Sequence, residues 1–258
     1  MLFRRYRERH PGSTLRKMLI FEFCRLLSIN FIRIFYRLRF SGLENVPRRG
    51  PLLIIANHQS FIDPPLVGGE MWFRHTDFIA RAGLFKFKPF GWLISALNSI
   101  PVTGEGNDTA AIKEALRRLE MGRCVILFPE GSRTADGAMR PFKRGIALLV
   151  KRARCPVIPA AIEGVHEAWP RARSRPFLFG KRVALKYGKP IPSDELMADG
   201  PDAALRLLEV QIDAMRLELR AQLRARSEGN YPPPGPGDLP YDPDNPPNDD
   251  LLDEAAAD

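Results

Sequence analysis

Short runs of apolar residues alternate with longer, mixed stretches through the middle of the chain. An apolar run of about four to eight residues, bounded by glycine, proline or polar residues, is typical of a buried strand, whereas the mixed stretches repeat apolar positions at helical spacing. Strands that alternate with helices predict an α/β fold with a mainly parallel central sheet covered by helices on both faces. The predicted strands are 52–56, 77–80, 99–102, 124–128, 157–162 and, at an edge, 183–187; the predicted helices are 65–73, 84–97, 109–120, 144–154 and the charged outer helix 202–226.

The segment before this alternating part, residues 1–41, is basic and carries a helical pattern from Ser13 to about Phe40. Cationic residues and Glu22 interrupt its apolar positions, and a spanning helix needs ~20 mostly apolar residues, so we expect no ordinary membrane crossing. A basic helix rich in aromatic residues is typical of segments that lie in the membrane interface. We therefore predict an amphipathic, helical membrane-contact segment; packing of the same helix on the body is the alternative, and the two are compatible.

The last part of the chain, residues 228–258, has nine acidic residues, eight prolines and no Lys or Arg. Such a composition cannot bury a core and predicts a disordered tail. The whole chain carries a net charge of +9, so residues 1–227 carry +18, from +9 − (−9). A body this basic favours an anionic partner, which leaves nucleic acid, anionic lipid and a phosphorylated substrate open. The predicted folded domain between the two flanking segments is 42–227.

The cysteines and histidines predict no metal site. Cys24, Cys124 and Cys155 lack paired or metal-type spacing, which favours buried thiols in a reducing compartment. The histidines are scattered along the chain without metal-ligand spacing. The arginine-rich start is followed by no uncharged segment with a small-residue cleavage site, so we expect no secretory signal.

Two polar side chains follow the first predicted strand, in the stretch Asn57-His-Gln-Ser-Phe-Ile-Asp63. Proline at position 64 disfavours the helical conformation at Asp63, so a turn is expected to separate it from His58 and to let the carboxylate fold back onto the imidazole. An imidazole oriented by a carboxylate is a common general base near neutral pH. The alternative is that His58 caps a helix or satisfies a buried polar group.

A second polar turn follows the predicted strand that ends at Phe128. Ligands of parallel α/β sheets bind beyond the carboxyl ends of the strands, so this turn belongs to the same rim as His58. Gly131 allows backbone N–H groups to approach a ligand, and Arg133 offers a planar fork that matches phosphate oxygens. Lys143 and its neighbour add cations at the start of the next helix. A surface salt bridge is the alternative role for Arg133.

Four ordered blocks resemble the 1-acylglycerol-3-phosphate acyltransferase family of glycerolipid acyltransferases, over about residues 40–190. They are Asn-His-x-x-x-x-Asp at 57–63, a basic residue after the second strand at Arg81, Phe-Pro-Glu-Gly-Ser-Arg-Thr at 128–134, and Val-Ile-Pro-Ala-Ala-Ile-Glu-Gly at 157–164. Two positions depart from the family pattern. The family usually has an arginine where this chain has residues 101–104. That arginine is the usual contact to the acceptor phosphate, so its absence bears on the identity of the head group. Arg81 stands where many relatives have a lysine, which keeps the charge but not the geometry.

The resemblance implies an enzyme that acylates lysophosphatidic acid to phosphatidic acid, using acyl-coenzyme A or acyl-carrier protein as co-substrate and no cofactor. The alternative is an acyltransferase that acts on another lysophospholipid or polar-lipid acceptor. The resemblance also implies a peripheral enzyme on the cytoplasmic face of a membrane, with lysophospholipid and the membrane surface as partners. His58 would be the general base and Asp63 its orienting partner. The implied substrate-binding residues are Arg81, which could also stabilise the oxyanion, Glu130, Gly131, Ser132 and Arg133, with Lys143 and Pro159 completing the pocket.

Three other functions receive less support from the residues. Ser60 and Ser132 lack the Gly-x-Ser-x-Gly arrangement of serine hydrolases. A membrane-surface protein that binds lipid without transferring anything is compatible with the charge and the basic helix. Nucleic-acid binding is disfavoured because the basic cluster Arg171–Arg175 lies in a predicted loop without aromatic stacking partners.

The aromatic and lysine-rich stretch 84–94 predicts either an acyl groove or core packing.

Overall fold

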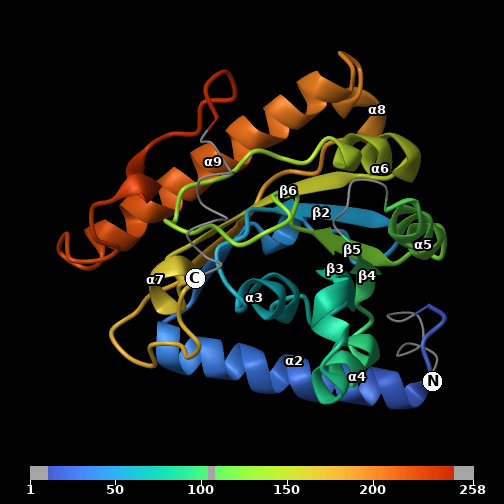
Figure 1. The fold of residues 1–258 in the computed structure, drawn as a ribbon, viewed down its shortest axis with the longest axis horizontal. Coiled ribbons are helices and arrows are strands. Elements are labelled where there is room, and N and C mark those ends of the chain that lie inside the picture. Colours follow the sequence, from blue (N-terminus) through green and yellow to red (C-terminus); the bar gives the residue numbers. More distant parts are fainter. Residues whose placement is uncertain (1–10, 104–107, 247–258) are drawn as a thin grey trace.

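The sheet at the centre of the molecule has seven strands in the order β1-β7-β6-β2-β5-β3-β4 (Figure 1). This computed structural model describes residues 11–103 and 108–246. Neighbouring strands run parallel except β6 and β7, which are antiparallel. The mainly parallel α/β fold is thus confirmed. The strands are β1 (Arg39–Ser41), β2 (Leu52–Ala56), β3 (Thr76–Arg81), β4 (Ile100–Val102), β5 (Cys124–Leu127), β6 (Val157–Glu163) and β7 (Ala184–Tyr187).

Helices cover both faces of this sheet (Figure 1). α5, α6, α8 and α9 lie over one face, and α2, α3, α4 and α7 lie over the other. The helices are α2 (Leu15–Tyr36), α3 (Asp63–Gly69), α4 (Lys88–Ala96), α5 (Thr109–Glu120), α6 (Gly145–Ala153), α7 (Val165–Ala168), α8 (Ser193–Leu196) and α9 (Pro201–Ala225), with short 3₁₀ helices at Leu43–Asn45, Ala82–Phe85 and Pro236–Asp238.

Strand β2 supplies both cores, because successive side chains of a strand point to opposite faces. Leu53 and Ile55 join the core beneath α5, α6 and α9. Leu52 and Ile54 join the core beneath α2, α3 and α7. All five residues of β2 are buried, which explains why this strand is a continuous apolar run in the sequence.

Parallel pairing brings the carboxyl ends of β2 and β5 together. Ile55 of β2 lies opposite Leu127 of β5, and Ala56 lies opposite Ala160 of β6. The turns that begin at Asn57 and Phe128 therefore leave the sheet side by side. This confirms the prediction that both polar turns belong to one rim.

The strands next to these turns match their predicted positions, whereas α3 begins and ends earlier than the predicted helix 65–73, and the sheet edge differs. β7 was expected at an edge, but it lies between β1 and β6. The outer strand β1 has only three residues, too few for a detectable alternation. The predicted helix 84–97 is divided into the 3₁₀ helix Ala82–Phe85 and α4. Proline at position 89 lies in the first turn of α4, where its missing N–H costs nothing.

The distribution of apolar and charged side chains around α2 differs from the predicted amphipathic pattern. Three of its charged residues contact the body: Glu22 lies 2.7 Å from His75, Arg25 donates to the carbonyl of Gly69 at 2.9 Å, and Arg33 pairs with Glu70, while Arg16 and Lys17 in the first turn are exposed. Apolar side chains occupy both the buried face and the exposed face. The exposed ones, with 36% to 72% of their surface accessible, are Leu15, Leu19, Phe23, Leu26, Leu27, Phe31 and Ile34.

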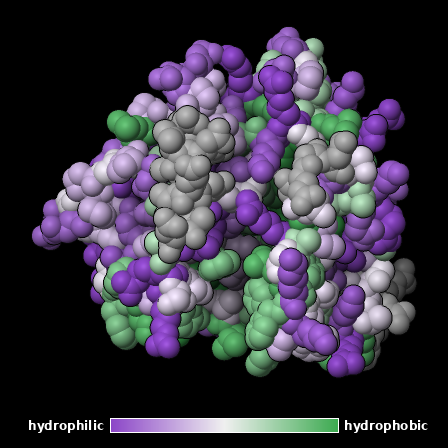
Figure 2. Space-filling view, in the orientation of Figure 1, coloured by the Kyte–Doolittle hydropathy of each residue, from purple (hydrophilic) through white to green (hydrophobic). Residues whose placement is uncertain are grey.

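Figure 2 shows hydrophobic side chains, in green, at the lower edge of the molecule, where α2 lies in Figure 1. Contiguous exposed apolar surface of this kind marks an interaction site. Within the described part of the chain, no helix combines the length and the apolar character that a membrane crossing needs. Residues 1–10 of the predicted membrane-contact segment lie outside the described residues.

The last helix and the residues after it also differ from the predictions. Helix α9 was expected to be a solvated outer layer, but Arg216 and Arg220 are buried and both pair with Glu163 of β6, at 3.4 and 2.6 Å. These arginines also donate to carbonyls in the segment 228–246, for example Arg216 to Gly237 at 2.6 Å. The segment therefore packs on α9, and the prediction of disorder is wrong for 228–246. Composition missed this because the arginines that hold the segment lie in another element; residues 247–258 are outside the described residues.

Candidate active site

His58 and Asp63 form the centre of the rim described above. The Nδ1 atom of His58 lies 2.7 Å from Oδ2 of Asp63, and the imidazole stacks on the ring of Phe128 with centroids 4.5 Å apart. Asp63 is fully buried, whereas 19% of the His58 side chain is exposed. The carboxylate thus holds one ring nitrogen and leaves Nε2 for a ligand, which is the arrangement of an oriented general base.

The carboxylate of Asp63 also shapes the turn that carries His58. Its Oδ2 atom accepts hydrogen bonds from the backbone N–H groups of Gln59 at 2.6 Å and Ser60 at 2.7 Å. Asp63 is the first residue of α3, although a residue that precedes proline was expected outside the helix. The first helical position tolerates this sequence because Pro64 and Pro65 need no intrahelical N–H bond there. The turn between His58 and Asp63 is as predicted.

Glu130 joins the two polar turns through hydrogen bonds. Its Oε1 atom accepts from the backbone N–H of His58 at 2.6 Å, and its Oε2 atom accepts from that of Arg140 at 3.2 Å. Burial raises the pKa of the Glu130 carboxyl well above its ordinary value, and the two backbone hydrogen bonds oppose that rise. Glu130 is 2% exposed and does not line the cavity, and its contact with glycerol phosphate stays a prediction of the family resemblance.

Arg133 has the features expected of an anion-binding residue. Its guanidinium lies over the ring of Phe61 at 3.6 Å, and its buried Nη1 atom has no hydrogen-bond partner within residues 11–103 and 108–246. Burial, followed by the positive charges of Arg171 and Arg81, lowers the pKa of Arg133 from its ordinary value. A buried donor without a partner costs free energy, and an anionic ligand would remove that cost. The predicted salt-bridge alternative is therefore disfavoured.

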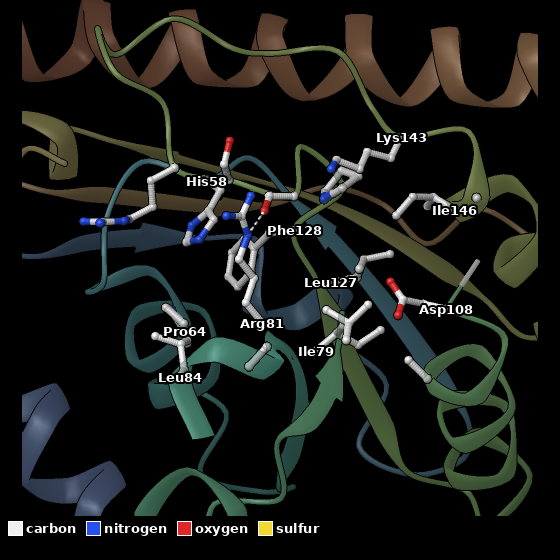
Figure 3. Close-up of a pocket in the computed structure, with 18 of the residues that line it drawn as sticks. His58, Pro64, Ile79, Arg81, Leu84, Asp108, Leu127, Phe128, Lys143 and Ile146 are labelled. Carbon is white, nitrogen blue, oxygen red and sulfur yellow. Dashed lines mark hydrogen bonds between the residues drawn. The ribbon is translucent and has the colours of Figure 1, made fainter. Parts of the chain in front are cut away.

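The other cations converge on the same turn. The Nε atom of Arg81 donates to the carbonyl of Gly131 at 2.9 Å (Figure 3), and Arg171 donates to the carbonyl of Arg133 at 3.4 Å. Gly131 has a φ of +73°, and a Cβ atom built there would lie 2.5 Å from Cε of Lys143. Glycine is therefore needed both for the backbone conformation and for the approach of the lysine.

These groups surround one cavity of about 700 Å³. The cationic side contains His58 and Arg81, and the opposite side contains the apolar residues Ile79, Leu127 and Ile146 (Figure 3). A site with a general base, an anion-binding group and an apolar extension suits a substrate that carries a phosphate and a long chain. The predicted residues that line the cavity are His58, Arg81, Gly131, Ser132, Arg133 and Lys143; Phe61, Arg144 and Arg171 line it as well.

The position without the family arginine lies beside this cavity. The backbone N–H of Thr103 donates to Asp108 at 2.7 Å, and Val102 and Asp108 line the apolar part. Asp108 occupies the predicted N-cap position of α5, but its carboxylate makes no capping hydrogen bond there. Within the described residues, cationic contacts to an acceptor can come from the cations that line the cavity, which are Arg81, Arg133, Lys143, Arg144 and Arg171.

Pro159 does not line the cavity either. It is buried in β6 beside Gly188, whose backbone N–H donates to the Pro159 carbonyl at 2.8 Å. The neighbouring residues position the site through Asn57, which both donates to and accepts from the backbone of Ile162, at 3.0 and 2.8 Å. This pair continues the β2–β6 ladder through a side chain and fixes the start of the His58 turn.

Gln59 is a second positioning residue that sequence analysis missed. Its side chain donates to Glu163 at 3.2 Å and accepts from the backbone N–H of Val165 at 3.3 Å. Glu163 in turn pairs with Arg216 and Arg220 of α9. No local pattern announces such contacts, because their partners lie far apart in the chain. Elsewhere in the described ranges, no group of three or more His, Cys, Asp or Glu residues is placed to hold a metal ion.

Comparison with known proteins agrees with this geometry. Residues 37–163 match the family model described as Acyltransferase. This segment, just under half of the chain, belongs to the acyltransferase family. The matched segment contains His58, Asp63, the Gly131 turn and β6, which are the parts of the sheet rim described above.

Several named acyltransferases are similar to the chain. A chloroplastic 1-acyl-sn-glycerol-3-phosphate acyltransferase of Brassica napus is 30% identical over 53% of this chain, and one of Bacillus subtilis is 27% identical over 67%. The crystal structure of the 1-acyl-sn-glycerophosphate (LPA) acyltransferase PlsC of Thermotoga maritima is 27% identical, covers 85% of this chain and 88% of its own, and superimposes with a TM-score of 0.66. The aligned part spans only 40% of the Brassica napus protein, although it spans 88% of the Bacillus subtilis one.

Proposed function

We propose that this acyltransferase moves an acyl group from an acyl thioester to the free hydroxyl of 1-acylglycerol 3-phosphate, giving phosphatidic acid. The proposal rests on two groups that line the same cavity. His58 is paired with Asp63 at 2.7 Å, and Arg133 has a buried guanidinium nitrogen without a hydrogen-bond partner among the described residues. The first group suits removal of a proton from a hydroxyl, and the second suits binding of a phosphate.

In the proposed reaction Nε2 of His58 takes the hydroxyl proton while the hydroxyl oxygen attacks the thioester carbonyl carbon. The tetrahedral intermediate collapses with loss of the thiolate, which receives the proton from the imidazolium. The acceptor itself is the nucleophile, so no acyl-enzyme is required. Asp63 keeps Nδ1 protonated and stabilises the positive charge that forms on the ring. Arg81 lies on the same cavity and is placed to stabilise the developing oxyanion.

The phosphate of the acceptor is assigned to the cations around the Gly131 turn. Arg133 lines the cavity with Arg171 and Lys143, and its buried Nη1 atom has no hydrogen-bond partner among the described residues. These groups compensate for the missing family arginine near Thr103. The apolar side, lined by Ile79, Leu127 and neighbours, is assigned to an acyl chain, because shielding each CH₂ from water contributes about 0.8 kcal/mol. Acyl-coenzyme A and acyl-carrier protein are both retained as donors.

We also propose that the protein works at a membrane surface, on the cytoplasmic face, as a peripheral protein. The exposed apolar face of α2 supports this, because Arg25 and Arg33 contact the body and leave this face largely apolar, while Arg16 and Lys17 add exposed positive charge at its first turn. A helix that exposes Phe23, Leu27 and Ile34 gains free energy when this face enters the lipid interface. The substrate, which carries a long chain, would then be taken up directly from the bilayer.

The test is an acylation assay on the purified full chain. Labelled lysophosphatidic acid is supplied with acyl-coenzyme A and, separately, with acyl-acyl-carrier protein, and the lipid products are separated by chromatography. Labelled phosphatidic acid is expected with at least one donor. Lysophosphatidylcholine and lysophosphatidylglycerol serve as matched acceptors. Product from one of these alone would overturn the acceptor assignment, and binding of lysolipid without any product would indicate a non-enzymatic lipid-binding protein.

A further inference from the structure

The loop between α7 and β7, residues 170–181, combines exposed apolar and cationic side chains in a way that the proposed function does not use. Phe177, Leu178 and Phe179 are 36%, 42% and 76% exposed. The value for Phe179 is the highest of any large apolar side chain in the described part of the chain. Single exposed apolar residues are ordinary, but three in succession mark an interaction surface.

The loop holds these side chains outward through its own contacts. The backbone N–H of Phe177 donates to the carbonyl of Ala168 at 2.8 Å, and the indole N–H of Trp169 donates to the carbonyl of Arg173 at 2.9 Å. The guanidinium of Arg173 and the ammonium of Lys181 both lie over the Phe177 ring, at 3.9 and 4.8 Å. The aromatic partners that sequence analysis found lacking for the arginine cluster are therefore present.

The tip of the loop continues the exposed apolar face of α2. The ring of Phe179 contacts that of Phe35 in the last turn of α2, with centroids 5.5 Å apart, and Phe35 contacts Phe31 at 4.6 Å. In Figure 1 the loop lies beside the C-terminal end of α2. At its other end the loop reaches the cavity through Arg171.

We propose that residues 170–181 are a second membrane-contact element, which inserts the Phe177–Phe179 tip into the lipid interface and selects anionic headgroups with Arg173, Arg175 and Lys181. An apolar tip flanked by cations matches the two layers of an anionic bilayer surface, and it is continuous with the apolar face of α2. An acidic protein such as an acyl-carrier protein would use the cations but would leave the three apolar side chains exposed to water. This inference rests on the proposed membrane-surface function.

The experiment measures flotation of the purified full chain with phosphatidylcholine vesicles, with and without phosphatidylglycerol. Phe179→Ser is expected to lower binding to both vesicle types by about tenfold, the loss expected for one phenylalanine no longer buried. The double variant Arg173→Gln/Arg175→Gln is expected to lower binding only to the anionic vesicles, by about fivefold for each charge. Leu207→Ser on α9, 47% exposed in the wild type, and Arg152→Gln on α6 are the matched controls and should float as the wild type does.

The proposal would be overturned if Phe179→Ser bound vesicles as well as the wild type does and had an unchanged melting temperature. It would also be overturned by a result in which the double variant loses binding to acidic acyl-carrier protein and keeps full binding to anionic vesicles, because the loop would then be a protein-docking site. Turnover of lysophosphatidic acid dispersed in detergent is measured in parallel and is expected to be retained in both loop variants. Flotation needs no turnover, so a failure of the proposed reaction is distinguishable from a failure of this inference.

Discussion

The carboxylate of Glu130 accepts a hydrogen bond from the backbone N–H of His58 at 2.6 Å, and this contact ties the turn after β5 to the turn after β2. The same carboxylate accepts from the backbone N–H of Arg140 at 3.2 Å. Glu130 thereby fixes the distance between the general base and the cationic turn that begins at Gly131. The contacts of its side chain within the described residues are with the backbone of the site.

Replacement of Glu130 should therefore change turnover more than substrate binding. Glu130→Ala leaves two buried backbone N–H groups without acceptors, at about 1–3 kcal/mol for each, whereas Glu130→Gln retains one acceptor oxygen. We expect kcat to fall in the order wild type, Gln, Ala, with the KM for lysophosphatidic acid changed less than about twofold. Steady-state kinetics at saturating donor measures both constants. A large rise in KM at unchanged kcat would restore the direct phosphate contact predicted from the family resemblance.

Arg133 is expected to behave in the opposite way. Charge-assisted hydrogen bonds contribute about 1.5–3 kcal/mol, so Arg133→Gln should raise the KM for lysophosphatidic acid roughly tenfold or more. Arg133→Lys keeps the charge but not the planar fork, and an intermediate KM is expected. Arg152→Gln, on the exposed surface of α6, is the control for loss of one positive charge. An acceptor KM that does not move in Arg133→Gln would remove this residue from the phosphate site.

Gly131 should not tolerate a side chain. Gly131→Ala combines a φ of +73° with a Cβ that would lie 2.5 Å from Cε of Lys143. The lysine can move, but the backbone strain of about 1–3 kcal/mol remains, so the Gly131 turn should shift and acylation should fall. Thermal unfolding and acylation are measured together. Gly145→Ala is the stability control, since a Cβ there meets nothing within 4 Å; equal stability and activity of Gly131→Ala and the wild type would contradict the strain argument.

The packing of residues 228–246 on α9 should depend on pH. The hydrogen bond from Arg224, with contributions from the backbone of Gly235 and from Arg220, holds the pKa of Asp238 well below its usual value of about 3.9. A carboxyl whose folded pKa is depressed stabilises the fold above the unfolded pKa and loses that contribution as pH falls below it. The segment should therefore stay protected from hydrogen exchange down to about pH 4 and lose protection below that pH.

Asp238→Asn should lower this protection at neutral pH by only a modest amount, because 27% of the Asp238 side chain is exposed and its ion pairs are partly screened by solvent. The difference between Asp238→Asn and the wild type should begin to shrink as the pH falls below about 4 and disappear only when the pH has passed the depressed pKa of folded Asp238. Hydrogen exchange followed by mass spectrometry resolves the segment. Equal protection in both proteins at neutral pH would show that the carbonyl contacts to Arg216 and Arg220 hold the segment without Asp238.

Sequence patterns predicted those parts of the molecule whose determinants are local. The buried strand 52–56 is an apolar run bounded by proline and by polar residues, and both sides of it are covered in the structure. The His58–Asp63 contact was predictable because both residues lie in one turn closed before a proline. The common rim followed from the parallel sheet alone.

The remaining features depend on contacts between distant segments. Glu130 and Arg133 belong to one sequence motif, but their side chains have different surroundings. The Glu130 carboxylate accepts a hydrogen bond from the backbone N–H of His58, whereas the buried Nη1 atom of Arg133 has no partner within the described residues. The face of α2 that meets the body is defined by Glu70 and Gly69, which no pattern within α2 indicates. Ordered packing of 228–246 likewise required knowledge of the arginines on α9.

The general-base role of His58 is the central claim and is tested most directly by His58→Ala. The measurement is the rate of transfer of a labelled acyl group from its thioester to lysophosphatidic acid, at saturating concentrations of both substrates. A well-placed general base contributes about 10² to 10⁴ in rate, so kcat should fall by that factor while the melting temperature and the affinity for lysophosphatidic acid stay close to those of the wild type. A correctly folded His58→Ala protein that transfers the acyl group at the wild-type rate would contradict the account.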